Sequence, residues 1–172
     1  EKLENLMDVD YLQGITVSQA IQFEKAFEGI VSVSHKNNVD LIIMGSHGAS
    51  GFQEMFIGSN TEKVVRSSDI PVLVIKKEDA DFSVEKFVFA SDFSDEIKNS
   101  FTKVVDFATK FSAHLNLVMI NTPNNFKSTE VANKIMTDFI QGFNISNYTS
   151  HIYNDTNVEK GVLNFAKSIN AD

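Results

Sequence analysis

The sequence contains no cysteine, no tryptophan, two prolines and a single arginine, Arg66. Without cysteine it can form no disulfide, thiolate metal site or cysteine nucleophile, and this composition fits a reducing, cytoplasmic compartment. Positive charge is also scarce, because 15 lysine and arginine residues stand against 23 acidic residues and leave a formal net charge of −8. Nucleic acids and anionic membranes bind cationic surfaces, so we expect neither as a partner. No apolar run approaches the ~20 residues that a membrane-spanning helix needs.

Hydrophobic residues make up 42% of the chain, and their spacing changes repeatedly between the periods of strands and helices. Strands are expected at residues 15–22, 39–44, 71–76, 86–90, 115–121 and 148–153. Helices are expected at 25–37, at 59–67, after Ser94, after Ser128 and at 157–169. Strands separated by helices favour right-handed crossovers, and therefore an α/β fold with a parallel sheet covered by helices on both faces.

A glycine-rich stretch follows the apolar segment 39–44 and ends where a helix is expected to begin. It includes Gly45, Gly48 and Gly58, and the last glycine is followed by Ser59-Asn60. This spacing is neither that of a Walker A loop nor the GxGxxG pattern. Backbone amides beside a helix N-terminus form an anion site, which favours a phosphate ligand. The alternative is a plain strand-to-helix loop whose glycines only make turns.

The form Gly45-x2-Gly48-x9-Gly58-Ser59-Asn60, with a strand on either side, closely resembles the ATP-binding loop of the universal stress protein family. The resemblance implies an open, Rossmann-like parallel sheet of five strands in the order 3-2-1-4-5, with helices on both faces. It also implies a regulatory stress-response protein whose cofactor is ATP, with or without Mg²⁺. The residues that would hold this adenine nucleotide are Gly45, Ser46, His47, Gly48, Gly58, Ser59, Asn60 and Asp92.

Three of these residues also have structural interpretations. Asp92 follows the expected strand 86–90, and by the resemblance it would contact the adenosine part of ATP at the carboxyl end of that strand. A carboxylate there could equally stabilise the start of the next helix, by about 0.3–1 kcal/mol. His47 could serve as a general base, but lining the phosphates or facing water is the simpler role. Ser59 has Glu62 three residues later, a capping-box spacing that predicts how the helix begins.

Two segments, residues 29–40 and 161–172, share glycine, asparagine and aspartate at matching places. Their offset is 132 residues (161 minus 29), which is the size of a domain. We therefore expect part of a tandem protein: residues 1–77 would be the C-terminal half of one universal-stress-like domain, 78–82 a linker, and 83–172 the N-terminal half of a second. The halves could combine as a circular permutant or by exchange between chains, or segments beyond this sequence could complete each domain.

Three functions are compatible with these patterns. The first is a nucleotide-binding regulator, and the second is a slow ATPase or nucleotide hydrolase that uses the same loop. The third is a scaffold that binds no nucleotide and works through the last strand of the family's sheet, Val72–Ile75. By the resemblance, that edge would form a homodimer or pair domains within one chain. The histidines show no metal-ligand spacing, no nucleophile motif is present, and Arg66 is the sole guanidinium that could stabilise a phosphoryl transition state, so we expect no catalytic residue and no metal.

Overall fold

The computed structural model describes residues 10–23, 25–46, 58–76 and 82–172. The chain divides into two compact units, Glu1–Asp79 and Ala80–Asp172. This boundary lies inside the segment 78–82 that was expected to be a linker, while the identity of the units as halves of two domains stays a prediction. Among the described residues, no helix is both long enough and apolar enough to span a membrane.

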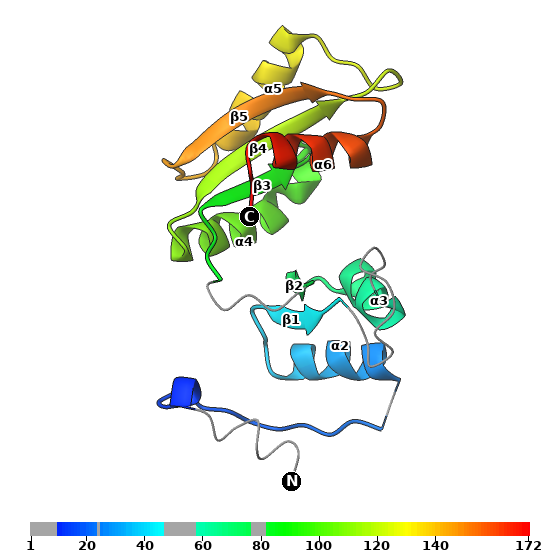
Figure 1. Cartoon of the computed structure of the whole chain (residues 1–172), viewed down its shortest axis with the longest axis vertical. Helices are drawn as coiled ribbons and strands as arrows, with labels where there is room; N and C mark the ends of the chain where they lie inside the picture. Colours follow the sequence, from blue (N-terminus) through cyan, green and yellow to red (C-terminus); the bar gives the residue numbers. More distant parts are fainter. Residues whose placement is uncertain (1–9, 24, 47–57, 77–81) are drawn as a thin grey trace. The chain divides into compact units, whose positions relative to one another are not determined.

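The first unit contains a two-stranded parallel sheet and two helices that pack on each other (Figure 1). Its elements in chain order are the 3-10 turn η1 (Asp10–Leu12), α2 (Ala26–Lys36), β1 (Ile42–Gly45), α3 (Ser59–Ser67) and β2 (Val72–Ile75). The two strands pair in register from Ile42 opposite Val72 to Gly45 opposite Ile75. Ile42 and Val64 are buried, and Val64 has no exposed surface. The predicted helices at 25–37 and 59–67 are confirmed.

Residues 15–22, which were expected to be a strand, form none. Three of their apolar side chains, Ile15, Val17 and Ile21, are 61%, 38% and 70% exposed. A strand requires hydrogen bonds to a neighbour, and no described strand pairs with this stretch. The prediction was wrong because alternation of apolar and polar residues says which side chains could be buried, and does not supply the partner strand.

The second unit is a three-stranded parallel sheet in the order β3-β4-β5 with helices on both faces (Figure 1). Its elements are β3 (Lys86–Ala90), the 3-10 turn η2 (Asp95–Ile97), α4 (Lys98–Lys110), β4 (His114–Asn121), α5 (Thr129–Ile140), β5 (Tyr148–Asn154) and α6 (Val158–Ser168). Helices α4 and α5 pack with Leu115, Leu117 and Met119 of β4. Helix α6 packs through Phe165 with Val118 and Ile120, on the opposite face. Alternate residues of β4 thus serve two separate cores.

The α/β class with parallel strands is confirmed, and the strands are divided between two sheets. The second unit pairs its strands in the order β3-β4-β5, and the first unit pairs β1 with β2. The expected order 3-2-1-4-5 over five strands stays a prediction. Among the described residues, neither unit forms a five-stranded sheet by itself.

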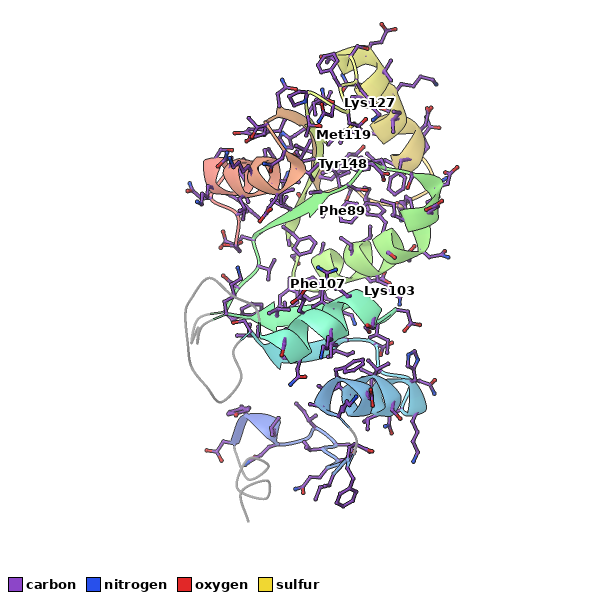
Figure 2. The ribbon with its side chains drawn as sticks, turned by 90° about the vertical axis from the view of Figure 1, so that its right-hand side faces the viewer. Phe89, Lys103, Phe107, Met119, Lys127 and Tyr148 are labelled. Carbon is purple, nitrogen blue, oxygen red and sulfur yellow. The ribbon has the colours of Figure 1, made fainter. Side chains whose placement is uncertain are left out.

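Phenylalanine dominates the larger core of the second unit. Phe101 of α4 is fully buried, and its ring centroid lies 4.9 Å from that of Phe89, 5.1 Å from that of Phe139 and 4.7 Å from that of Phe143. Aromatic pairs at such distances contribute about 0.5–1.5 kcal/mol each beyond the area that they bury. Strand β5 adds Tyr148 to this core, which also contains Phe89 and Met119 (labelled in Figure 2), and adds Tyr153 to the core on the α6 side.

Two of the helix starts in this unit depend on side-chain caps. Ser128 accepts a hydrogen bond from the amide of Val131 at 3.3 Å, and Asn157 accepts one from the amide of Lys160 at 2.9 Å. The helix expected after Ser94 begins later, because the chain first forms η2 and enters α4 only at Lys98. The helices expected after Ser128 and at 157–169 are confirmed.

The repeated segments 29–40 and 161–172 also have the same hydrogen bonds at the C-termini of their helices, α2 and α6. Helices α2 and α6 have the same length of 11 residues, and their bounds differ by the repeat offset. After each helix an asparagine takes a positive φ, 49° at Asn38 and 51° at Asn170. The next amide then bonds back to the helix, from Val39 to the carbonyl of Ser34 at 3.0 Å and from Ala171 to that of Ala166 at 2.9 Å. The two copies therefore share one C-terminal geometry.

The repeated glycine faces different surroundings in the two copies, which allows a matched test. A Cβ at Gly161 would lie 2.5 Å from Cγ2 of Ile120, whereas a Cβ at Gly29 would lie 3.1 Å from Cβ of Gln22. We expect Gly161→Ala to lower the free energy of unfolding by about 1 kcal/mol or more, because overpacking of about 1–3 kcal/mol exceeds the gain in helix propensity. Gly29→Ala should be neutral or stabilising, by up to about 1 kcal/mol. Urea unfolding followed by circular dichroism measures both, and equal effects would refute the packing argument.

Candidate functional site

Three hydrogen bonds hold the carboxyl end of β1, and two of them join it to the start of α3. The amide of Gly58 donates to the carbonyl of Ser46 at 2.6 Å, and the amide of Ser46 donates to the carbonyl of Ile75 at 2.8 Å. The hydroxyl of Thr61 donates to the carbonyl of Gly45 at 2.9 Å. The structure therefore brings Gly45 and Ser46 next to Gly58.

Five of the predicted site residues thus lie together at one end of the first unit: Gly45, Ser46, Gly58, Ser59 and Asn60. Ser46 is buried, whereas Ser59 and Asn60 are exposed. His47 and Gly48 lie outside the described residues, so their predicted roles stay predictions. Asp92 belongs to the second unit.

Helix α3 begins without a side-chain cap. Its N-cap residue is Gly58, which has no side chain to accept a hydrogen bond, and the amide of Glu62 is bonded to the Gly58 carbonyl at 2.9 Å. The predicted capping box is wrong, because Ser59 is the first helical residue and Glu62 pairs with Arg66 at 3.1 Å instead. No capping side chain among the described residues covers the first-turn amides of α3. These donors and the positive end of the helix dipole are what a phosphate group requires.

Glycine at position 58 is not required by the backbone conformation. Its φ of −57° and ψ of 144° are available to any residue. What glycine provides is space, because a Cβ is missing at the point where the chain enters the helix. A ligand can therefore approach the amide groups of the first turn closely. This fits the phosphate chain of ATP, which Gly58, Ser59 and Asn60 would hold.

Asp92 lies in a turn after β3 and is exposed. Its Oδ1 accepts a hydrogen bond from the amide of Ser94 at 3.1 Å, and this bond lowers the pKa of the Asp92 carboxyl below its usual value. The carboxylate is thus ionised at neutral pH and orders the turn before η2. The interpretation of Asp92 as a structural residue at the start of a helical segment is therefore supported, and its contact with adenosine stays a prediction.

The residue after Asp92 has a strained backbone. Phe93 has a φ of 58°, a left-handed conformation that is rare for a bulky side chain. Its ring is buried and lies 5.4 Å from the ring of Phe139 and 6.1 Å from that of Phe89. Packing of this ring holds the strained turn, which presents Asp92 to solvent at the carboxyl end of β3. Strain of this kind is concentrated at functional sites.

Sequence reasoning missed Thr61, whose side chain is buried and joins the helix to β1. The sequence does show a threonine in the first turn of the predicted helix, where its hydroxyl can donate to a backbone carbonyl. It does not show which carbonyl lies nearby. Within the described ranges, no three histidine, aspartate or glutamate side chains are placed to hold a metal ion.

Comparison with known proteins gives matches over the first unit. The universal stress protein family model matches residues 1–76. Universal stress protein MJ0577 of Methanocaldococcus jannaschii is 38% identical over 79 residues, which are 46% of this chain and 49% of that protein. Universal stress protein YxiE of Bacillus subtilis is 31% identical over 74 residues, which are 43% of this chain and 50% of that protein. The chain spans about half the length of these curated relatives.

Solved structures resemble nearly the whole chain. A universal stress protein from Archaeoglobus fulgidus superimposes with a TM-score of 0.70 at 22% identity, over 98% of this chain and 60% of its own. The protein PA1789 of Pseudomonas aeruginosa, of unknown function, gives a TM-score of 0.70 at 17% identity over 99% of this chain and 63% of its own. At these identities the likeness shows the fold alone. Residues 1–76 thus match the universal stress protein family model, and the curated relatives that the chain resembles are universal stress proteins.

Proposed function

We propose that this chain binds an adenine nucleotide, ATP, at the junction of β1 and α3, and that binding serves a regulatory role. The match of residues 1–76 to the universal stress protein family model supports a role in stress response. Nucleotide binding is known for some members of this family. The proposal adds that the glycine-rich loop of this chain is a working phosphate site.

One observation carries the proposal, namely that the loop begins and ends at the uncapped N-terminus of α3. The Gly58–Ser46 hydrogen bond of 2.6 Å fixes both ends of the loop beside the first-turn amides. A plain connecting loop needs no such closure, and a helix that serves only the fold usually begins with a capping side chain. Closure without a capping side chain among the described residues leaves the first-turn amides of α3 as donors, which suit phosphate oxygens.

The residues assigned to the phosphates in this proposal are Gly58, Ser59 and Asn60, with Gly45 and Ser46 forming the floor of the site. His47 and Gly48 would contribute from within the loop. Asp92 would contact the adenosine part of the nucleotide only if the two predicted half-domains combine to share one site. When bound, ATP supplies negative charge that the helix N-terminus neutralises, and Mg²⁺ would share that charge. A nucleotide that binds the folded state stabilises that state by mass action. The concentration of nucleotide can therefore change the fraction of the protein that is in a form able to bind a partner.

Isothermal titration of the full chain with ATP and Mg²⁺, after bound nucleotide has been removed, tests the proposal directly. Saturable binding at one site per chain supports it. No binding by a sample whose circular dichroism shows it to be folded would overturn it. Phosphate release, followed in the same sample, separates a binding protein from an ATPase.

Substitution of Asn60 by aspartate separates phosphate binding from helix stability. The change is isosteric and adds one negative charge in the first turn of α3, where Asn60 is exposed. We expect Asn60→Asp to weaken ATP binding by about tenfold or more, which corresponds to about 1.4 kcal/mol. The unfolding temperature should not fall, because a carboxylate at a helix N-terminus is stabilising by about 0.3–1 kcal/mol. Titration calorimetry and thermal unfolding give the two values.

Asn38→Asp is the matched control for this variant. It makes the same isosteric change at an exposed residue of the same unit. Asn38 precedes the amino end of β1, whereas the proposed site lies at the carboxyl end of that strand. Asn38 has a φ of 49°, which aspartate tolerates. ATP affinity should be unchanged in this control. Equal affinity of Asn60→Asp and the unchanged chain would refute the assignment of phosphate to α3.

Asp92 is tested with a pair of variants. Asp92→Asn keeps an oxygen that can accept from the amide of Ser94 and removes the negative charge, whereas Asp92→Ala removes both. We expect Asp92→Asn to lower ATP affinity several-fold, because a carboxylate accepts hydroxyl hydrogen bonds more strongly than an amide, and to lower the unfolding temperature only slightly. Asp92→Ala should lower both values further. If Asp92→Asn leaves the affinity unchanged, either the site is split between separate domains or Asp92 has only a role in the turn.

A further inference from the structure

A cluster of polar side chains lies on β4, β5 and the loop before β5 in the second unit. We call it the histidine network, and its members are His114, Asn116, Asn147, Thr149 and His151. Asn116 is buried, although the rest of β4 from Leu115 to Ile120 is apolar. The strand register places Asn116 opposite Thr149. Two histidines, a hydroxyl and two amides therefore meet on one face of the sheet, and neither the fold nor the phosphate site requires them.

The orientation of both amide groups follows from their bonds to backbone carbonyls. Nδ2 of Asn147 donates to the carbonyl of Ala113 at 3.2 Å, and Nδ2 of Asn116 donates to the carbonyl of His114 at 3.3 Å. A carbonyl oxygen can only accept, so the amide nitrogens must face these groups. The two Oδ1 atoms are then the acceptors that point into the network.

The bond to Asn147 fixes one nitrogen of His114. Nδ1 of His114 lies 2.7 Å from Oδ1 of Asn147, which can only accept, so Nδ1 carries a proton. The other nitrogen of this ring, Nε2, lies 3.1 Å from Oγ1 of Thr149. Whether Nε2 also carries a proton depends on whether the Thr149 hydroxyl donates to this nitrogen or accepts from it.

The Thr149 hydroxyl has three neighbours and one proton. Its Oγ1 lies 3.2 Å from Oδ1 of Asn116, 3.1 Å from Nε2 of His114 and 2.8 Å from Nε2 of His151. A hydroxyl donates once and accepts twice. Because Oδ1 of Asn116 accepts only, the single proton of Thr149 goes to Asn116, and both histidine Nε2 atoms must donate to Oγ1.

We infer that the histidine network is a one-proton site, in which His114 is the imidazolium and His151 stays neutral with its proton on Nε2. In this state each contact of the network has one donor and one acceptor. When His114 loses its Nε2 proton, two acceptors, Nε2 of His114 and Oδ1 of Asn116, compete for the single hydroxyl proton of Thr149. One of the two bonds must then be given up, so a single proton changes the side-chain contacts between β4 and β5.

Burial opposes a positive charge on His151. It lowers the pKa of His151, and repulsion from His114 lowers it further, so this ring resists protonation. The ring of Phe165 on α6 packs against His151 with centroids 4.9 Å apart. Phe165 belongs to a hydrophobic cluster against which Val162 of α6 and Ile169 also pack. A positive charge on His151 would therefore lie against an apolar ring.

Strand β3 and the chain end contribute the remaining charged groups near His114. Lys86 pairs with His114 in the strand register, and its ammonium donates to the carbonyl of Ile169 at 3.0 Å. The carboxylate of Asp172 accepts from the amides of Glu85 and Lys86 at 2.7 and 2.8 Å, and these bonds lower the pKa of Asp172. Asp172 thus keeps its negative charge through the range in which imidazoles titrate, so the proton-dependent change belongs to the two histidines.

Ring-nitrogen NMR of the full chain, from pH 8.5 down to pH 5.0, tests this inference. At high pH we expect His114 as the Nδ1–H tautomer and His151 as the Nε2–H tautomer. On acidification Nε2 of His114 should gain its proton first, while His151 stays neutral. The inference is overturned if His151 gains a proton before His114, or if neutral His151 carries its proton on Nδ1. His35, which pairs with Asp69 at 3.2 Å in the first unit, is the internal reference.

Variants of Thr149 keep the test independent of how the resonances are assigned. Thr149→Val removes the hydroxyl and keeps the shape, and Thr149→Ser keeps the hydroxyl. We expect the Nε2–H preference of His151 to be lost in Thr149→Val and retained in Thr149→Ser. Because Thr149 is exposed and water can replace a lost bond, the effect should be seen in the tautomers rather than in a large change of stability. An unchanged His151 tautomer in Thr149→Val would overturn the inference.

Discussion

The hydrogen bond from the amide of Gly58 to the carbonyl of Ser46 is the constraint on which the first unit depends. It connects the end of β1 to the start of α3, while the adjacent amide of Ser46 continues the strand pairing to Ile75. Because both bonds are made by the backbone, neither of them uses a side chain of the first turn of α3. The fold therefore closes the loop without using Ser59 or Asn60.

The second unit is built around a different constraint, which is that β4 lies between two strands and two layers of helices. Its residues alternate between the phenylalanine-rich core on the α4 and α5 side and the smaller core under α6. Toward its amino end, the α6 side of this strand carries His114 and Asn116 in place of apolar residues. Buried polar groups must find partners, and Thr149 on β5 provides one for each of them.

Much of this fold can be predicted from the sequence, and the errors have a common cause. Helix α3 was predicted with its observed bounds, because apolar spacing and a following Pro71 limit it locally. Residues 15–22 were wrongly predicted as a strand, since strand formation depends on a partner that the local pattern does not contain. The capping box at Ser59 was wrong for a related reason, because the N-cap is Gly58, whose amide donates to the carbonyl of Ser46 at the end of β1. The histidine network shows the same limit, because His114 and Thr149 come together only through the register of β4 and β5.

The placement of the tyrosines has a spectroscopic consequence. The chain has no tryptophan and three tyrosines. Two of them, Tyr148 and Tyr153, lie in β5 and pack against the two cores of the second unit, whereas Tyr11 is 79% exposed. Unfolding changes the fluorescence of a packed tyrosine far more than that of a tyrosine whose ring is already in contact with water. Intrinsic fluorescence of this protein therefore reports the unfolding of β5, and it changes little when the unit that carries the glycine-rich loop unfolds.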